Sequence, residues 1–437
     1  MQILQEEFIR RRKIFFSYMR KNSVAIIAGA KETIRTGDSR FSFRQNSDFY
    51  YLTGFHEPDA IAVFHTMNSL GEYILFSRSA SPMREMWEGK SVGQAGAVSE
   101  YKADSAFPIE SFEEKLVEIL EGSHFLYYTF NDDHRLDRQL FRTFKKIKNK
   151  RRRGGEVAEC IFSSDLLLHE MRLFKSETEI TMMSKAAQIT VEGHLHAMKV
   201  IKPGLWEYQV QAEMAYAMSM QGMRSFAYEP IVASGSNACT LHYCDNVAIL
   251  KKEDLVLIDV GAEYQNYASD VTRTLPVSGK FSPAQKAIYE LVLDAQSAVI
   301  KMIRPGLGWD EMQKKVVDIL TLGLIDLGLL KGKKAELIDK KAHLPFYMHS
   351  AGHWLGLDTH DVGRYKIHDE WRKLRPNMVL TVEPGLYISA NNQDVEEKWR
   401  GIGVRIEDDV LVTEEGSKVL TERLPSTVKD IEALMLT

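Results

Sequence analysis

The sequence predicts a mixed α/β (α+β) protein of two domains, and three observations lead to this prediction. The chain has 437 residues, which is more than one ordinary hydrophobic core accommodates. Strand-like and helical stretches alternate over roughly the first 170 residues. Two similar segments, 201–205 and 303–307, indicate an internal repeat in the remainder. We therefore expect an N-terminal α/β domain at 1–172 and a C-terminal domain at 173–437.

The composition is that of a globular protein, with 44% hydrophobic and 27% charged residues. A net charge of −4 provides no overall basic field for nucleic acid. The basic run 145–153 lacks interleaved aromatics, which favours a solvated helix end and linker over a nucleic-acid patch. The three cysteines form no CxxC pair, no apolar run is long enough for a membrane span, and the start of the chain lacks the apolar core of a signal peptide. We expect a soluble cytoplasmic protein without membrane or nucleic-acid partners.

Four apolar runs in the N-terminal domain predict β-strands, because β-branched and aromatic residues dominate them. They are residues 24–27, 60–64, 73–76 and 125–128. Residues 111–120 predict a helix, which completes the alternating pattern.

The C-terminal domain is expected to begin with two helices. Residues 176–179, Ser-Glu-Thr-Glu, form a capping box that predicts a helix running to about Ile201. Pro203-Gly204 ends this helix, and a second helix is expected from about Leu205 to Gln221.

Three acids of this domain lie where an unpaired carboxylate is costly. Asp259 closes one apolar run, Glu383 closes another, and Glu407 lies inside a third, and we predict all three runs as strands. The runs are residues 255–258, 378–382 and 403–412. Burial disfavours the ionised carboxylate, so each acid needs a positive partner. Taken singly, each is better explained as an N-cap, a strand-end surface group or a partner in an ion pair.

Together with Asp270 and His353, these acids make a set of five metal ligands. Four carboxylates and a neutral imidazole carry four negative charges, which balance two divalent cations and leave room for a bridging water or hydroxide. Two cations about 3.5–4 Å apart would lower the pKa of that water and stabilise the attacking and departing atoms of a hydrolysis. Ligation mainly by oxygen with one nitrogen favours Mn²⁺, with Co²⁺, Fe²⁺ or Zn²⁺ as alternatives.

The internal repeat supports this ligand set. The sequence IKPGL at 201–205 returns as IRPGL at 303–307, each time between two helical stretches. The first half then supplies Asp259 and Asp270, and the second supplies Glu383 and Glu407. Two unrelated Pro-Gly pairs would explain the helix ends but not the matched acids. We expect the metals on a pseudo-twofold axis in the middle of a shared sheet.

Strand alternation also separates one acid from the ligand set. Asp409 lies one strand position beyond the proposed ligand face, so its loss should matter far less than the loss of Asp270.

Five motifs in a fixed order carry a family resemblance. They are IDVGA (258–262), YASDVTRT (267–274), HSAGHWLGLDTHD (349–361), TVEPGLY (381–387) and GIGVRIED (401–408). They resemble the pita-bread metallopeptidases, and within them the bacterial-type aminopeptidase P (Xaa-Pro aminopeptidase) group. The stretch RQNSDFYYLTGF at 44–55 is similar to the N-terminal domain of that group. The resemblance implies an N-terminal aminopeptidase P-type domain followed by a catalytic pita-bread domain.

The resemblance also implies roles for the ligands. Asp259 would bind one metal, Asp270 and Glu407 would bridge both metals, and His353 and Glu383 would bind the other. The bridging hydroxide would attack the scissile carbonyl, and Glu383 would handle its proton.

Further residues are implied to contact the substrate. His360 and His242 would stand near the developing oxyanion and the leaving group, where a donor stabilises transition-state charge. His349, Tyr228 and Arg405 are candidates for the wall of a proline pocket. The complete set is, for catalysis, Glu383, His360, His242 and Arg405, and for substrate binding, His349, Tyr228, Tyr387 and Trp87, the last reaching over the site of a neighbouring subunit.

The implied activity is that of an aminopeptidase that cleaves the bond between an N-terminal residue and a penultimate proline. Its partners would be such peptides and further copies of the chain in a dimer or tetramer. An Xaa-Pro dipeptidase (prolidase), which shares the site but accepts only dipeptides, is the main alternative. A methionine aminopeptidase resembles the second domain alone. A non-catalytic pita-bread binding scaffold and a metal-free enzyme of the creatinase kind are disfavoured by the complete ligand set.

Overall fold

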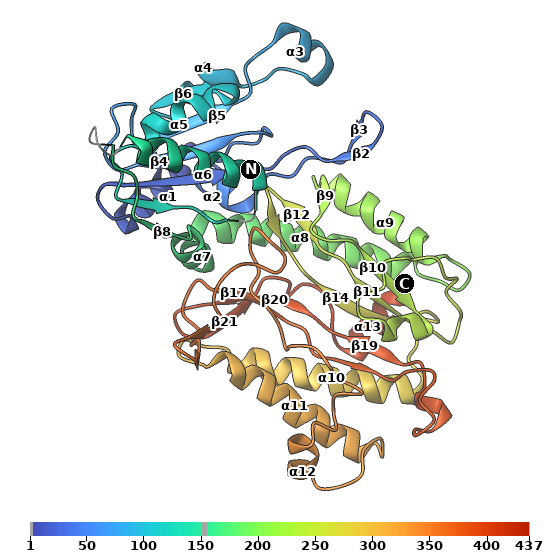
Figure 1. Ribbon diagram of the computed structural model, residues 1–437. Helices are drawn as coiled ribbons and strands as arrows, with labels where there is room; N and C mark the ends of the chain where they lie inside the picture. Colours follow the sequence, from blue (N-terminus) through green and yellow to red (C-terminus); the bar gives the residue numbers. More distant parts are fainter. Residues whose placement is uncertain (1–2, 131, 151–154, 437) are drawn as a thin grey trace. The chain divides into compact units, whose positions relative to one another are not determined.

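The computed structural model describes residues 3–130, 132–150 and 155–436. The chain divides into two compact units, Met1–Met171 and Arg172–Thr437 (Figure 1). This division lies one residue from our expected limits, 1–172 and 173–437, which we keep as the proposed domain limits. Of the basic run 145–153, the first part belongs to a helix, whereas residues 151–154 lie outside the described residues.

A six-stranded mixed sheet forms the centre of the N-terminal unit, in the order β6-β5-β4-β1-β7-β8. Its strands are β1 Ser23–Ala28, β4 Ile61–His65, β5 Tyr73–Ser77, β6 Ser105–Pro108, β7 Phe125–Tyr127 and β8 Cys160–Phe162, and a separate hairpin consists of β2 Ile34–Thr36 and β3 Ser39–Arg40. β1 pairs antiparallel with β4 and parallel with β7. The four predicted strands are confirmed as β1, β4, β5 and β7.

The N-terminal part of the chain also contains several helices. They are α1 Gln5–Tyr18, α2 Ser47–Thr53, α3 Pro82–Glu88, α4 Gly93–Ser99, the short 3-10 helix η1 Ile109–Ser111, α5 Phe112–Leu120, α6 His134–Asn149 and α7 Asp165–Leu173. The predicted helix at 111–120 is confirmed as α5, whose Leu116 and Ile119 share a core with Leu140 of α6 and Ile26 of β1. The helix α3 has no buried residue.

The C-terminal unit contains two long helix pairs. α8 Glu177–Val200 precedes α9 Glu207–Met220, and α10 Pro283–Met302 precedes α11 Trp309–Asp326; α12 Lys334–Asp339 and α13 Val428–Met435 follow. Figure 1 shows α10 and α11 lying side by side. The predicted capping box is confirmed, because Ser176 accepts from the Glu179 N–H and Glu179 accepts from the Ser176 N–H. No helix in the described part of the chain combines the length and apolarity of a membrane span.

Small antiparallel sheets lie between these helix pairs. β10 Ile231–Ser234, β11 Leu255–Asp259 and β14 Thr272–Pro276 form one, and β9 Ser225–Phe226, β12 Ala262–Tyr264 and β13 Tyr267–Ala268 form another. The second half supplies β17 Val379–Val382, β20 Asp408–Val412 and β21 Ser417–Val419, the pair β18 Gly385–Tyr387 and β19 Gly403–Arg405, and the short hairpin β15 Lys366–Ile367 with β16 Glu370–Trp371.

The internal repeat extends to individual backbone hydrogen bonds. Gly204 and Gly306 have φ values of +91° and +89°, a region that strains residues with a Cβ. The Gly204 N–H donates to Leu250 O at 2.9 Å, and the Gly306 N–H donates to Leu374 O at 2.8 Å. Each leucine N–H donates in return to the residue after the glycine, in both cases at 2.8 Å. The two Pro-Gly segments are therefore equivalent turns in two similar halves.

Two details differ from the sequence predictions. The stretch 403–412 is not one strand, because β19 pairs with β18 whereas β20 pairs with β17 and β21, and the chain changes partners at Ile406 and Glu407. The expected shared sheet is likewise divided into several small sheets. At the junction, the Glu407 N–H donates to Thr272 O at 3.1 Å. The break places Glu407 at a junction between strands of the two halves.

Candidate metal centre

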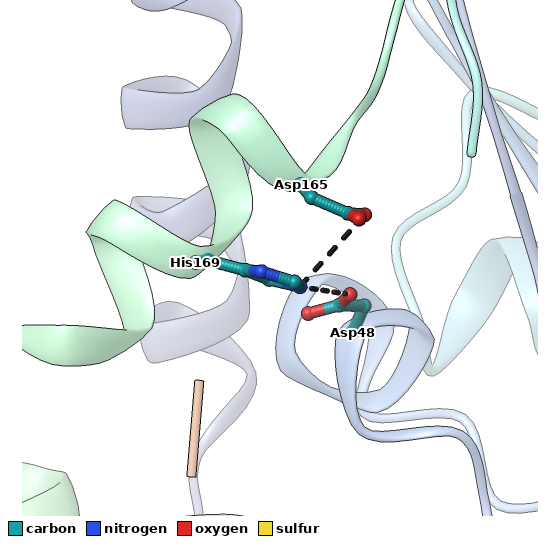
Figure 2. A group of neighbouring side chains, drawn as sticks. All are labelled: Asp48, Asp165 and His169. Atoms are coloured by element: carbon teal, nitrogen blue, oxygen red, sulfur yellow. Dashed lines mark hydrogen bonds and ion pairs between the residues drawn. The ribbon is translucent and has the colours of Figure 1, made fainter. Parts of the chain in front are cut away.

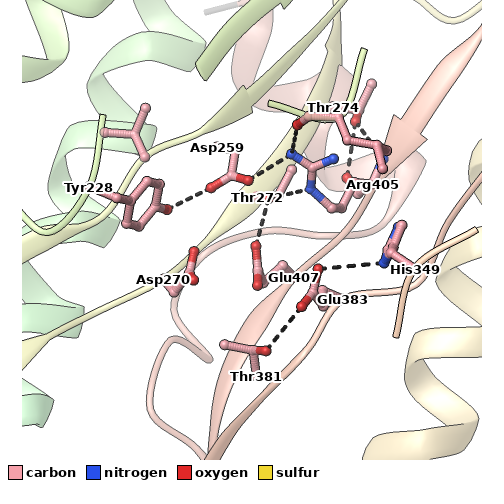
Figure 3. A network of polar contacts seen from close by, with 12 residues as sticks. Tyr228, Asp259, Asp270, Thr272, Thr274, His349, Thr381, Glu383, Arg405 and Glu407 are labelled. Carbon is pink, nitrogen blue, oxygen red and sulfur yellow. Dashed lines mark hydrogen bonds and ion pairs between the residues drawn. The ribbon is translucent and has the colours of Figure 1, made fainter. Parts of the chain in front are cut away.

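Strand ends and breaks deliver the predicted acids to one place. Asp259 is the last residue of β11, and Asp270 lies between β13 and β14. Glu383 directly follows β17, and Glu407 lies between β19 and β20. Figure 3 shows the four carboxylates gathered where these strands meet. His353 approaches beside β17, since its neighbour Trp354 forms an isolated β-bridge with Leu380.

Distances define the centre of this group. Asp270, His353 and Glu407 each offer one ligand atom, and these atoms lie within 4.8 Å of one another. His353 Nε2 is 3.3 Å from Asp270 Oδ2 and 3.6 Å from Glu383 Oε1. The structure thus brings four of the five predicted ligands together around one imidazole nitrogen.

Asp259 borders the group from the other side. Its Oδ1 accepts a hydrogen bond from the Tyr228 hydroxyl at 2.6 Å, and its Oδ2 accepts from Arg405 Nη2 at 2.7 Å. A carboxylate has about four lone-pair sites, so these two bonds leave acceptor capacity on both oxygens.

One hydrogen bond sets the tautomer of His353. Its Nδ1 lies 2.9 Å from the carbonyl oxygen of Trp354, which can only accept, so the proton is on Nδ1. In the neutral ring, the Nε2 lone pair therefore points at Asp270 and Glu383. A backbone carbonyl that fixes the remote nitrogen is the usual support of a metal-binding histidine.

The electrostatics of the group favour an added cation. Burial raises the pKa of Glu407, and the charges of Asp270 and Glu383 raise it further. Burial raises the pKa of Glu383 to about 7, with His353 opposing this rise and Asp270 adding to it. Burial lowers the pKa of His353, but the hydrogen bond and charge of Asp270 outweigh this effect and raise the pKa to about 9. Divalent cations would reverse these shifts, and the donor set fits them.

A chain of hydrogen bonds forms one wall beside the acids. Arg405 Nη1 donates to the Tyr387 hydroxyl at 2.9 Å, and this hydroxyl lies 2.8 Å from His349 Nε2. His349 Nδ1 lies 2.8 Å from Ser350 O, so Nδ1 carries the proton and Nε2 accepts from Tyr387. Burial, helped by the charge of Arg405, lowers the pKa of His349 to about 4 and keeps the ring neutral.

The two remaining histidines lie at the exposed side. The ring of His360 packs edge-on against His353, with centroids 4.4 Å apart. Burial and then the charge of His353 lower the pKa of His360. His242 is exposed but near enough for its charge to lower the pKa of both His349 and His360.

Sequence reasoning missed several residues that hold the ligands. The Thr272 hydroxyl donates to Glu407 Oε2 at 2.7 Å, and Thr381 accepts from the His353 N–H at 3.1 Å. Strand alternation could have signalled both threonines, because each lies two residues from a ligand on the same face. Asp409 accepts from the Asp270 N–H at 3.1 Å, so it supports a ligand, contrary to the expectation that it is peripheral.

Trp87, the substrate-binding candidate of the N-terminal unit, lies on α3 and is 86% exposed. The neighbouring Met86 is 83% exposed. Both side chains are therefore available for contact with another molecule.

The N-terminal unit contains another group with metal-ligating side chains, Asp48, Asp165 and His169 (Figure 2). His169 Nε2 lies 3.3 Å from Asp48 Oδ2 and 3.8 Å from Asp165 Oδ1. The contact with Asp48 joins α7 to α2 by an ordinary hydrogen bond or ion pair. We interpret this group as a structural contact that holds α7 against α2.

Comparisons with known proteins agree with this geometry. The model of metallopeptidase family M24 matches residues 181–414, and that of the aminopeptidase P N-terminal domain matches residues 8–127. The Xaa-Pro aminopeptidase of Escherichia coli (strain K12) is 41% identical over 436 residues, covering 100% of this chain and 98% of the relative.

Solved structures give the same result. Aminopeptidase PepP of Pseudomonas aeruginosa is 48% identical with a TM-score of 0.98, covering 100% of this chain and 98% of that one. Zinc-substituted E. coli aminopeptidase P in complex with product is 40% identical with a TM-score of 0.96, covering 100% and 99%. The predicted family and fold class are confirmed. With a family model over more than half of its length and relatives over all of it, the chain belongs to metallopeptidase family M24, in the aminopeptidase P group.

Proposed function

We propose that this protein is an Xaa-Pro aminopeptidase, which removes the N-terminal residue from peptides with proline in the second position. The observation that carries the proposal is the convergence of Asp270, His353, Glu383 and Glu407. The E. coli relative named Xaa-Pro aminopeptidase matches the chain over its whole length, which supports the same activity.

Two divalent cations are the proposed cofactors, with Mn²⁺ as the favoured metal and Co²⁺, Fe²⁺ or Zn²⁺ as alternatives. Asp259 would hold one cation, His353 and Glu383 the other, and Asp270 and Glu407 would bridge them. When bound, the cations supply activation of the attacking water and polarisation of the scissile carbonyl. The mainly oxygen donor set favours Mn²⁺, although zinc was substituted in the E. coli relative.

The protein's own groups then direct the reaction. Glu383, which lies beside the proposed cations, takes up the proton of the attacking water on a carboxylate oxygen. His360 and His242 donate to the charge that develops on the carbonyl oxygen and the leaving group. His349, Tyr228, Tyr387 and Arg405 form the wall of the proline pocket, and Arg405 also holds Asp259 in place.

A bond before proline suits this arrangement. Proline lacks the amide N–H that peptidases usually bind, and its ring fixes φ. Activation by cations does not need that N–H, whereas a shaped pocket can select the ring. We infer that the substrate bond must be trans, because the cis isomer converts only slowly.

Dipeptide specificity is the competing activity. The match to an aminopeptidase P N-terminal domain favours the aminopeptidase. We also propose that the protein acts in the cytoplasm as a homodimer or homotetramer.

The test is a panel of Xaa-Pro peptides of two to six residues, assayed with Mn²⁺, after chelation, and after Mn²⁺ is restored. We expect cleavage before proline in tripeptides and longer peptides, at rates similar to or above those for dipeptides. Chelation should abolish activity and Mn²⁺ should return it. Cleavage of dipeptides alone would identify a prolidase, and full activity in protein shown by elemental analysis to be metal-free would reject the metal mechanism.

A further inference from the structure

The loop between β10 and β11 carries His242, and one buried carboxylate holds it. Residues 235–239 of this loop form a 3-10 helix, and the chain then passes through His242 before returning to β11 at Leu255. His242 itself is exposed. The position of this ring is therefore set by the anchoring of the loop rather than by burial of the ring.

Glu207, the first residue of α9, is the anchor. It is 0% exposed and accepts hydrogen bonds on both carboxylate oxygens. Oε1 accepts from the Ser234 N–H at 2.7 Å, the Ser234 hydroxyl at 2.8 Å and Asn237 Nδ2 at 3.1 Å. Oε2 accepts from the Tyr243 hydroxyl and the Ala248 N–H, both at 2.8 Å.

These donors are spread along the loop. Ser234 ends β10 where the loop begins, Tyr243 is the residue after His242, and Ala248 lies near the return to β11. The backbone adds a further tie, since the Glu207 N–H donates to Ala248 O at 2.9 Å. One side chain thus fixes the start, the middle and the far part of the loop.

Only a carboxylate fits this cradle. Both oxygens face donors, so the amide nitrogen of glutamine would oppose a donor in either orientation. The negative charge also lies in the first turn of α9, where the helix dipole favours it. The donors around Glu207 and the start of α9 therefore favour a carboxylate at this position over a neutral amide of the same shape.

The loop also touches the proline-pocket wall. Arg405 Nη2 reaches the carbonyl oxygen of Leu241, the residue before His242, at 3.5 Å. His242 is thus flanked by Leu241, next to Arg405, and by Tyr243, bound to Glu207.

We propose that Glu207 is a positioning residue for catalysis, which acts through Tyr243 to hold His242 toward the reacting groups. This inference rests on the proposed peptidase function and adds to it a residue outside the metal centre. The hydrogen bond between Tyr243 and Glu207 is the part of the anchor that acts directly beside the histidine.

A double-mutant cycle tests the proposal. Tyr243→Phe removes one hydroxyl and should lower kcat on the order of 10-fold, because a small displacement of a catalytic group is costly, with little change in KM or metal content. In a His242→Ala background the same substitution should have no further effect. Equal losses in both backgrounds would show that Tyr243 does not act through His242. Tyr216→Phe, at an exposed tyrosine of α9, is the matched control and should retain wild-type kcat.

A second measurement is independent of activity. Hydrogen exchange over residues 235–248 should be faster in Glu207→Gln and in Tyr243→Phe than in the wild type, with the remainder of the catalytic unit unchanged. If Glu207→Gln does not fold, the exchange rates of Tyr243→Phe alone test the proposal. Unchanged exchange in the loop would overturn the proposal. A wild type that cleaves no Xaa-Pro peptide would instead contradict the proposed function. The hydrogen-exchange result would still show whether Glu207 and Tyr243 hold the loop in place.

Discussion

Two adjacent acids, Glu407 and Asp408, have opposite surroundings although both are buried. Asp408 Oδ1 forms an ion pair with Arg273 at 2.8 Å, and Gln296 donates to its Oδ2 at 2.7 Å. Glu407 accepts a hydrogen bond from the Thr272 hydroxyl, and burial raises the pKa of Glu407. The protein thus supplies Asp408 with a cation, Arg273, whereas the Glu407 carboxylate would be stabilised by an added metal cation. This contrast separates a structural acid from a proposed ligand more sharply than burial does.

Asp270→Ala should lower metal content and nearly eliminate turnover, since it removes a proposed bridge and leaves the remaining acids unbalanced. The matched control is Asp294→Ala, at an exposed position of α10, which should retain both properties. Metal content by elemental analysis and kcat on an Xaa-Pro peptide are the measurements. A wild-type kcat in Asp270→Ala would reject the assignment. Asp409 is unsuitable as a control, because it accepts from the Asp270 N–H.

At the scale of elements, the sequence predicted the features that depend on residues close together in the chain. The capping box at Ser176, the turns at Gly204 and Gly306 and the acids at strand ends all follow from neighbours in sequence. The break at Glu407 depends on which strand pairs with which, and the role of Glu207 depends on donors 27 to 41 residues away. Such distant partners leave no trace in hydrophobic periodicity, so neither the break at Glu407 nor the role of Glu207 could be predicted from it.

The equivalent turns allow a stability prediction. Gly306→Ala should lower the free energy of unfolding of the catalytic unit by about 1–2 kcal/mol, because alanine is strained at positive φ. Apart from the adjoining residues, no atom lies within 4 Å of the added Cβ, so the cost is one of backbone conformation alone. Gly416→Ala, where φ is not positive and the nearest atom is 4.0 Å away, is the control. Urea unfolding of both variants measures the difference, and equal stabilities would contradict the interpretation.

At the scale of the whole molecule, the exposed Trp87 leads to a prediction about assembly. If it narrows the active-site mouth of a neighbouring subunit, Trp87→Ala should change KM or the preferred peptide length more than metal content, because an aromatic wall contacts substrate and not the ligands. Tyr18→Ala, at another exposed aromatic residue of the N-terminal unit, serves as the control. Light scattering would report the number of subunits. Unchanged kinetics in Trp87→Ala would leave the tryptophan without a role in the site.

The two halves of the catalytic unit are alike in carboxylates but not in their other charges. Within the proposed ligand set, only the second half contributes an imidazole, His353, and Arg405 lies 2.7 Å from the Asp259 carboxylate of the first half. In the proposed site, a cation beside Asp259 would therefore face the competing positive charge of Arg405 and would have fewer ligands of its own. We expect graded chelation to remove the cations one at a time, through a half-loaded protein with one cation per chain, detectable by elemental analysis after each step. Loss of both together would contradict this order of release. A duplicated scaffold would thus carry two non-equivalent positions, one that retains its metal firmly and one that exchanges it with the surroundings.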